Sequence, residues 1–134
     1  MLRKIKGQRK GQALVEMALI LPLLLLLLFG IIEFGRVMGA GIIVTHSARE
    51  GARYGAVGAT DSEIVTSIQT KSAAVLYDAE EPAKLSVNIA RTGPTEGGDI
   101  EVKVSYEVTL YLPFVSNMMG NPFTVTGAAV MRTE

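Results

Sequence analysis

Apolar residues are concentrated in the first third of the chain, where they form one long uncharged run. No charged residue lies between Met17 and Ile32, and Ala13–Val15 extend the run to twenty residues if Glu16 is included. About 20 apolar residues suffice to cross a bilayer as a helix. The pattern therefore predicts a transmembrane helix over about residues 13–35.

The helical pattern does not stop after Arg36. Small residues continue it at a spacing of four, at Ala48, Ala52 and Ala56. One helix is therefore predicted over about residues 12–57, on the order of 65–70 Å long at 1.5 Å per residue. Pro22 is expected to kink it, because proline lacks a backbone N–H and its ring clashes with the preceding turn.

Glycines recur along this helix with a spacing that places them on one face. Gly35 and Gly39 form one such pair, and Gly51 and Gly55 form a second. Small residues spaced in this way let another backbone approach closely, as in membrane helix pairs. We therefore predict helix packing at these four glycines. The alternative is a loosened, interrupted helix, because glycine is a poor helix former.

The pattern changes in residues 58–134, which we expect to form a separate α+β module. Thr60 and Glu63 have the spacing of a capping box, which predicts a second helix ending before Pro82. Apolar and polar residues then alternate over 85–89, 100–112 and 123–131, which is typical of strands, and residues 92–99 have the composition of a hairpin loop.

The predicted fold class is therefore α+β: a long N-terminal helix, a second helix and an antiparallel sheet of about three strands. The long helix is expected to pack on one face of the sheet. Residues 113–121 are predicted to be an apolar loop, which either is an exposed contact surface or is tucked under the sheet.

Charge is distributed as unevenly as hydrophobicity. Residues 1–11 contain five basic residues and no acidic residue, so the remainder has eight bases against thirteen acids. Basic flanks keep their end of a membrane span in the cytoplasm, which places the module outside. A net negative module argues against nucleic-acid binding, and the absence of cysteine excludes disulfides and thiolate chemistry.

A basic segment followed by an apolar run is also how a secretory signal peptide begins. The run is longer than the usual 7–15 residues of such a leader, and Met38-Gly39-Ala40 lacks the small-residue cleavage pattern. A membrane anchor fits better. The basic leader, Gly11, Glu16 as the fifth residue after it, and the apolar helix together resemble the prepilin peptidase site of type IV pilins and pseudopilins.

The resemblance extends over about residues 11–57, which are similar to the TadE-like family of pseudopilins from the bacterial tight-adherence (Flp) pilus machinery. The features that match are GQALVE, the proline in the leucine run, the exit IIEFGR and the block AREGAR. Met131–Glu134 also resemble the C-terminal end of TadE-like proteins. A pilin-like architecture is implied by this resemblance.

The resemblance implies that a membrane-embedded prepilin peptidase cuts between Gly11 and Gln12 on the cytoplasmic side. The chain then divides into a cytoplasmic leader (1–11), a TadE-like segment (12–57) and an extracytoplasmic module (58–134). Gln12 departs from the aromatic or methionine start of true pilins, which leaves its N-methylation open.

The implied function is that of a minor pseudopilin in the bacterial inner membrane, which takes part in assembling a Flp pilus for adhesion. Its partners would be the peptidase, other pilin or pseudopilin subunits, the inner-membrane assembly platform and membrane lipid. The alternative is an uncleaved single-pass protein with an extracytoplasmic interaction module.

Glu16 stands out because a charge at the bilayer centre costs about 2.5–3.5 kcal/mol on insertion scales. After cleavage it lies about one turn from the freed ammonium group of Gln12. The resemblance implies that Glu16 pairs with the N-terminus of a neighbouring subunit during assembly. The alternative is that it only reaches the headgroups from the helix end.

Catalytic and metal chemistry are not indicated. No carboxylate pair, Ser/His/Asp set or phosphate-binding loop has a usable spacing, and His46 is a lone histidine without a set of Cys, Asp or Glu residues at metal-ligand spacing. Glu33 and Arg36 stand three residues apart, which predicts an ordinary ion pair. We expect neither an enzyme nor a cofactor site.

Overall fold

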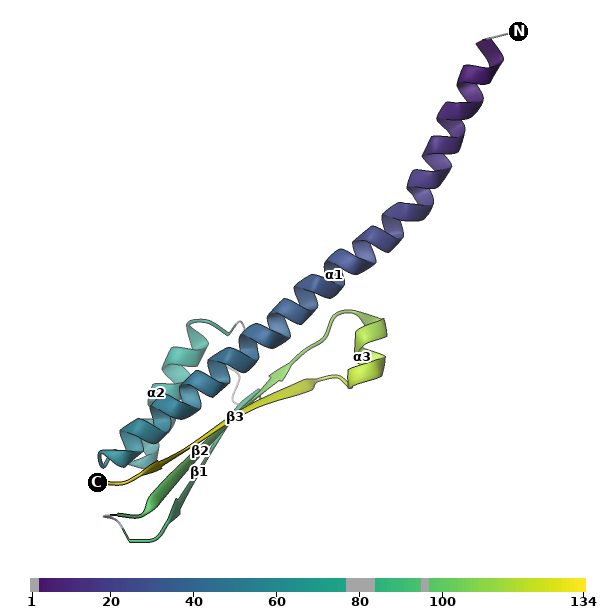
Figure 1. Cartoon of the computed structure of the whole chain (residues 1–134). Coiled ribbons are helices and arrows are strands. Elements are labelled where there is room, and N and C mark those ends of the chain that lie inside the picture. Colours follow the sequence, from purple (N-terminus) through teal and green to yellow (C-terminus); the bar gives the residue numbers. More distant parts are fainter. Residues whose placement is uncertain (1–2, 77–83, 95–96) are drawn as a thin grey trace.

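The computed structural model describes residues 3–76, 84–94 and 97–134, and these form the predicted α+β fold (Figure 1). The elements follow the order α1 (Arg3–Ala56), α2 (Asp61–Ala73), β1 (Leu85–Thr92), β2 (Asp99–Val108), α3 (Pro113–Met119) and β3 (Phe123–Arg132). Residues 78–82, whose sequence is acidic and typical of a turn, lie outside the described residues.

Helix α1 is one uninterrupted helix of 54 residues, so it is about 80 Å long. It begins at Arg3, earlier than the sequence pattern predicts, and it continues through Pro22 with a visible bend in its N-terminal half (Figure 1). It ends at Ala56, where the Ala59 N–H donates to the carbonyl of Tyr54 and Gly58 adopts a φ of 92°. This left-handed glycine is a common way to terminate a helix.

The three strands form an antiparallel sheet in the order β1-β2-β3. Leu85 faces Tyr106 across the β1–β2 pair, and Val108 faces Phe123 across the β2–β3 pair. Alternate residues of β2 are buried, and the intervening residues Glu101 and Lys103 are exposed. One sheet face is therefore apolar and covered, while the other is polar, as the alternating pattern predicts.

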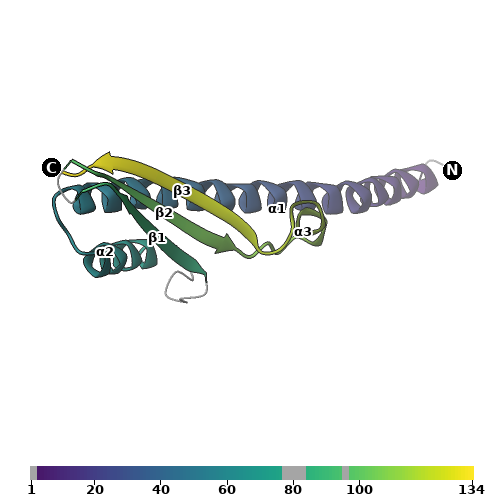
Figure 2. The ribbon, with the colours of Figure 1, turned by 90° about the horizontal axis from the view of Figure 1, so that it is seen from below.

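The C-terminal half of α1 lies along the apolar face of the sheet (Figure 2). Its buried apolar side chains are small and recur every four positions, at Ala40, Val44, Ala48, Ala52 and Ala56. Gly127 of β3 makes this contact close, because a Cβ added there would lie 2.5 Å from the Cα of Thr45. The packing of the long helix on one sheet face is thus as predicted.

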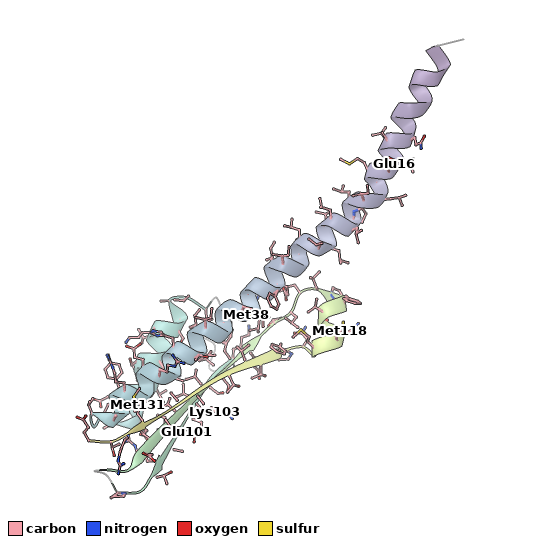
Figure 3. All side chains as sticks on the ribbon, in the orientation of Figure 1. Glu16, Met38, Glu101, Lys103, Met118 and Met131 are labelled. Carbon is pink, nitrogen blue, oxygen red and sulfur yellow. The ribbon has the colours of Figure 1, made fainter. Side chains whose placement is uncertain are left out.

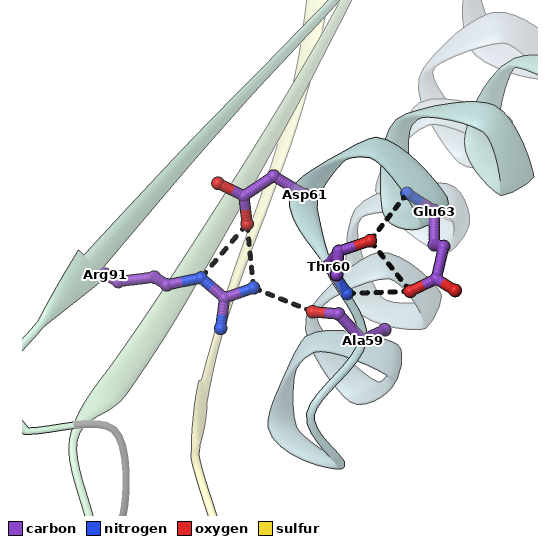
Figure 4. Close-up of polar contacts among 5 residues, drawn as sticks. All are labelled: Ala59, Thr60, Asp61, Glu63 and Arg91. Atoms are coloured by element: carbon purple, nitrogen blue, oxygen red, sulfur yellow. Dashed lines mark hydrogen bonds and ion pairs between the residues drawn. The ribbon is translucent and has the colours of Figure 1, made fainter.

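Helix α2 begins at the predicted capping box and packs beside α1 (Figure 4). The Thr60 hydroxyl accepts from the Glu63 N–H at 3.4 Å, and the Thr60 N–H donates to the Glu63 carboxylate at 2.9 Å. Arg91 of β1 then joins this helix start to the sheet, donating to Asp61 and to the carbonyl of Ala59. Ile64 and Ile68 of α2 are buried in the common core.

The structure differs from the sequence-based expectation between β2 and β3. The predicted strand over 100–112 ends at Val108, and the predicted apolar loop contains the short helix α3. Asn121 explains the end of the strand, because its side-chain amide occupies both the N–H and the C=O of Leu110. Pro113 then begins α3 without needing an N–H partner. Most of this segment is exposed, although Val115 packs half-buried against the core, so the segment as a whole is not tucked under the sheet.

Candidate functional site

The residues expected at the cleavage site lie within α1, without tertiary contacts. Gly11 and Gln12 are exposed, and a Cβ built on Gly11 meets nothing within 4 Å. The bond between them is therefore held only by the helix itself. Glycine weakens a helix interior by up to about 1 kcal/mol relative to alanine, which makes this turn one of the easier ones to unwind.

Glu16 lies one turn further along the same helix, and its side chain projects outward (Figure 3). No hydrogen bond or ion pair joins its carboxylate to any residue in the described parts of the chain. Its spacing of four from Gln12 places the two residues on neighbouring positions of one helix face. The structure therefore leaves this carboxylate available for a partner outside the chain.

The apolar surface around Glu16 is also uncovered. Every residue from Gly11 to Phe29 is exposed, including the leucine run. Helix α1 is the one helix of the described residues that is long and apolar enough to cross a membrane, and its most apolar window is not buried by any other part of the protein. It is therefore compatible with a single-pass membrane protein.

The four glycines predicted for helix packing fall into two groups. A Cβ on Gly51 would lie 2.7 Å from Ile68, and one on Gly55 would lie 2.1 Å from Ile100. These two glycines therefore accommodate side chains of the chain's own α2 and β2. Gly35 and Gly39 have nothing within 4 Å of an added Cβ, and they line an open pocket together with Leu76 and Val108 of the module.

Glu33 has a role that its sequence neighbourhood did not reveal. Its ion pair with Arg36, at 3.1 Å, was expected, but the residue is only 5% exposed. The other carboxylate oxygen accepts from the backbone N–H of Tyr111 at 2.8 Å. A single buried carboxylate therefore fastens the β2–α3 connection to the helix.

Arg36 completes this cluster. Its guanidinium donates to Glu33 and to the carbonyl of Thr109, and it lies 4.6 Å from the centre of the Tyr111 ring. Such a cation–π contact adds to the ion pair. Nothing in the spacing of Glu33 and Arg36 pointed to this long-range contact, since the partner atoms are mainly backbone atoms more than seventy residues away.

The polar block that follows on α1 makes a second link within the module. Glu50 pairs with Lys71 of α2, and the Lys71 ammonium lies 5.2 Å from the Tyr54 ring centre. The hydrogen bond from Lys71, with its charge, lowers the pKa of Glu50, and the hydrogen bond to Glu50 raises the pKa of Lys71. The pair joins α1 to α2 at the surface.

Metal binding has no support in the described part of the chain, where no group of three or more His, Cys, Asp or Glu residues could hold an ion. The N-terminal half of α1 is instead an uncovered apolar helix that carries the unpartnered carboxylate of Glu16. The α+β module packs on the C-terminal half of the same helix. This architecture defines the class: an α+β module carried on a candidate membrane-spanning helix.

Comparison with known protein families finds a match in the segment that forms most of α1. Residues 11–53 match the family described as TadE-like protein, as the sequence motifs predicted. The N-terminal segment of the chain is thus similar to TadE-like proteins over these residues. The match begins at Gly11 and ends at Arg53, so the resemblance noted for Met131–Glu134 lies outside it. No curated protein and no solved structure matched the chain.

Proposed function

We propose that this protein is a minor pseudopilin without catalytic activity, which a prepilin peptidase cuts between Gly11 and Gln12 and which then takes part in assembly of a Flp pilus for surface adhesion. The observation that carries the proposal is the TadE-like match, which begins at Gly11, the residue before the proposed cut. The leader that precedes it is basic and lies outside the match.

The surroundings of Glu16 support an assembly role. An unpaired carboxylate in hydrocarbon is costly, and an opposite charge within about 4–6 Å favours its ionised form. The cut would create an ammonium group at Gln12, and Glu16 has no partner in the described residues of its own chain. We propose that Glu16 pairs with the new N-terminus of a neighbouring subunit and sets the register between helices.

Orientation and partners follow from the same proposal. The basic leader would stay in the cytoplasm and the module would lie outside the inner membrane, in accordance with the positive-inside rule. The partners would be the peptidase, other pilin or pseudopilin subunits and the inner-membrane platform. Gly35 and Gly39, where an added Cβ meets nothing within 4 Å, are candidate positions for close contact with a neighbouring helix.

The test is to co-express the full chain with a prepilin peptidase and to determine its N-terminus by mass spectrometry. A chain that begins at Gln12 is expected. Gly11→Val should abolish the cut, because the β-branched side chain fills the space at the scissile bond. Since a Cβ at Gly11 meets nothing within 4 Å, a loss of cleavage would reflect the peptidase and not misfolding.

Gly30→Val is the matched control, because a Cβ at Gly30 also meets nothing within 4 Å and the position lies in the same helix. This variant should be cut like the wild type. If the wild-type chain retains residues 1–11 in the presence of an active peptidase, the pseudopilin proposal fails and the uncleaved single-pass interpretation takes its place.

A further inference from the structure

Helix α3 and the residue pair that precedes it present an unusual apolar surface. Tyr111, Phe114 and Met118 are 66%, 68% and 74% exposed, and Met119 is also exposed. The chain from Val108 to Met131 contains no charged residue at all. A contiguous apolar group on an exposed tip is a feature of contact surfaces.

The position of this tip along α1 is fixed by Glu33. If the membrane-spanning stretch begins at Ala13, about 20 residues bring it to Ile32, close to the end of the span predicted over about residues 13–35. Glu33 is the next residue, and its carboxylate holds the Tyr111 N–H at 2.8 Å. The start of α3 therefore lies at the level where α1 would leave the bilayer.

The fold also directs α3 toward the membrane. Figures 1 and 2 show α3 beside α1, at the end of the sheet that is closest to the uncovered half of the helix. Met118 is on this tip in Figure 3, on the same side of the module as the exposed apolar part of α1. The Asn121 side chain hydrogen-bonds to both the N–H and the C=O of Leu110, and so joins the two ends of the segment that contains α3.

The polar groups at the base of the tip suit a membrane interface. Tyrosine is enriched where a bilayer meets water, and the Arg36 guanidinium lies 4.6 Å from the Tyr111 ring centre. The carboxylate in contact with this segment, Glu33, is covered and paired with Arg36. A cation and an aromatic ring thus lie next to the apolar tip, without an exposed acid in this cluster.

From these observations we infer that α3 is a second membrane contact, which rests in the interface of the outer leaflet beside the exit of α1. Phe114, Met118 and Met119 enter the headgroup and upper acyl region, to a depth on the order of 5–10 Å, as interfacial segments do. One membrane helix alone leaves the helix and its module free to tilt and to rotate together about the helix axis. With α3 in the interface, two points hold the sheet at a fixed orientation to the bilayer.

This inference rests on the proposed insertion of α1, and the experiment separates the two. Because the chain contains no cysteine, single-cysteine variants of the full chain can carry one environment-sensitive fluorophore. Met118→Cys tests the tip, Leu24→Cys reports insertion of α1, and Val130→Cys is a matched exposed apolar position on β3, since Leu24 and Val130 are 58% and 61% exposed. The chains are placed in nanodiscs that hold one copy each.

The measurements are quenching by lipids that carry a nitroxide and quenching by aqueous iodide. The label at position 118 should be quenched by nitroxides near the headgroup and protected from iodide, and the label at position 130 should show the reverse. The label at position 24 should be quenched by nitroxides deep in the acyl chains. Since all three side chains are exposed, the substitutions leave the core packing unchanged.

Three outcomes would overturn the inference. If position 118 behaves like position 130 while position 24 contacts lipid, α1 is inserted and α3 remains in water. If position 118 becomes protected only when further copies of the chain are added, the tip contacts protein and not lipid. If position 24 itself contacts no lipid, the proposed insertion of α1 fails together with this inference.

Discussion

The two halves of α1 belong to one continuous helix but meet opposite surroundings. From Gly11 to Phe29 every residue is exposed, whereas Val44, Ala48 and Ala52 in the other half are fully buried. The first half is made of large apolar residues, and the buried stripe of the second half is made mainly of alanine. The two halves of α1 thus differ both in the burial and in the size of their apolar side chains.

The difference shows what each environment requires of a helix. Lipid chains adapt to any apolar surface, so the leucine run needs hydrophobicity and no shape complementarity. Protein interiors pack at the density of a crystal. The half of α1 that lies against the sheet therefore needs small side chains that fit the fixed surface of the sheet. Gly127 extends this requirement to β3, where the backbone of Thr45 occupies the space of a side chain.

Two of the glutamates of α1, Glu33 and Glu16, repeat the contrast. Glu33 is buried and has two partners in the chain, Arg36 and the Tyr111 N–H. Glu16 is exposed and has no partner among the described residues. A satisfied carboxylate within a fold stabilises that fold, while an unsatisfied one on an apolar surface is available for an intermolecular contact.

The largest effect is expected from adding one methyl group where the helix meets the sheet. Gly127→Ala places a Cβ 2.5 Å from the Thr45 Cα, and because the obstacle is backbone, the module should lose about 3 kcal/mol of stability. Chemical denaturation of the full chain in detergent, followed by circular dichroism, measures this loss.

Gly35→Ala is the control for the same methyl group on the open part of α1. Its Cβ meets nothing within 4 Å, so the substitution should be neutral or stabilising by up to about 1 kcal/mol. An equal loss for both variants would contradict the contrast between a packed and an uncovered surface.

The next effect concerns the two glutamates. Glu33→Ala leaves the Tyr111 N–H without its acceptor and removes the partner of Arg36, which should cost about 2 kcal/mol of module stability. The same denaturation experiment measures this change. Glu16→Ala should leave the stability of the module unchanged, because Glu16 makes no contact with it.

Substitution of Glu16, which should not change the stability of the module, should have a large effect on pilus assembly. In cells that carry the pilus machinery, Glu16→Ala and Glu16→Gln should still be cut after Gly11 but should be incorporated poorly, as detected in purified surface fractions. Wild-type incorporation of both variants would disprove the pairing proposed for this carboxylate.

The smallest effect is a pH dependence of the module surface. The pKa of Glu50 is lowered from 4.5 by Lys71, so the pair stabilises the fold above that pH and is lost as the pH falls through the lower folded value. The pKa of Lys71 is raised above 10.5, so its contribution is lost only as the pH rises through that raised value. Between these limits the contribution is constant.

Unfolding midpoints at neutral pH and well below pH 4.5 measure the acid limb. Lys71→Met removes the partner and should reduce the difference between the two midpoints, with a smaller effect in high salt, because exposed ion pairs are screened. Glu63, whose pKa is lowered by the Thr60 N–H, supplies a second acid-sensitive contact that Lys71→Met leaves intact.

Much of the fold follows from local patterns in the sequence. The unbroken apolar run predicts a membrane-spanning helix, the Thr60–Glu63 capping box predicts the start of α2, and the period of two predicts the three strands. Each of these signals depends on neighbouring residues alone. The motif formed by the leader, Gly11 and Glu16 is likewise local, because it depends only on the spacing of residues along one helix. A peptidase or a neighbouring helix would recognise that spacing directly.

Contacts between distant residues were decided only by the tertiary structure. The sequence presents Glu33 as a local partner of Arg36, but its second partner is the backbone N–H of Tyr111, and every residue but proline has such a group. The early end of β2 depends on the Asn121 side chain, which hydrogen-bonds to Leu110. The glycine pair 51/55 has the same spacing as the pair 35/39, and only the packed structure distinguishes them. Periodicity determines which elements form, because it acts through the backbone of one segment. Which carboxylate is satisfied and which apolar surface stays uncovered depends on what the folded chain brings alongside.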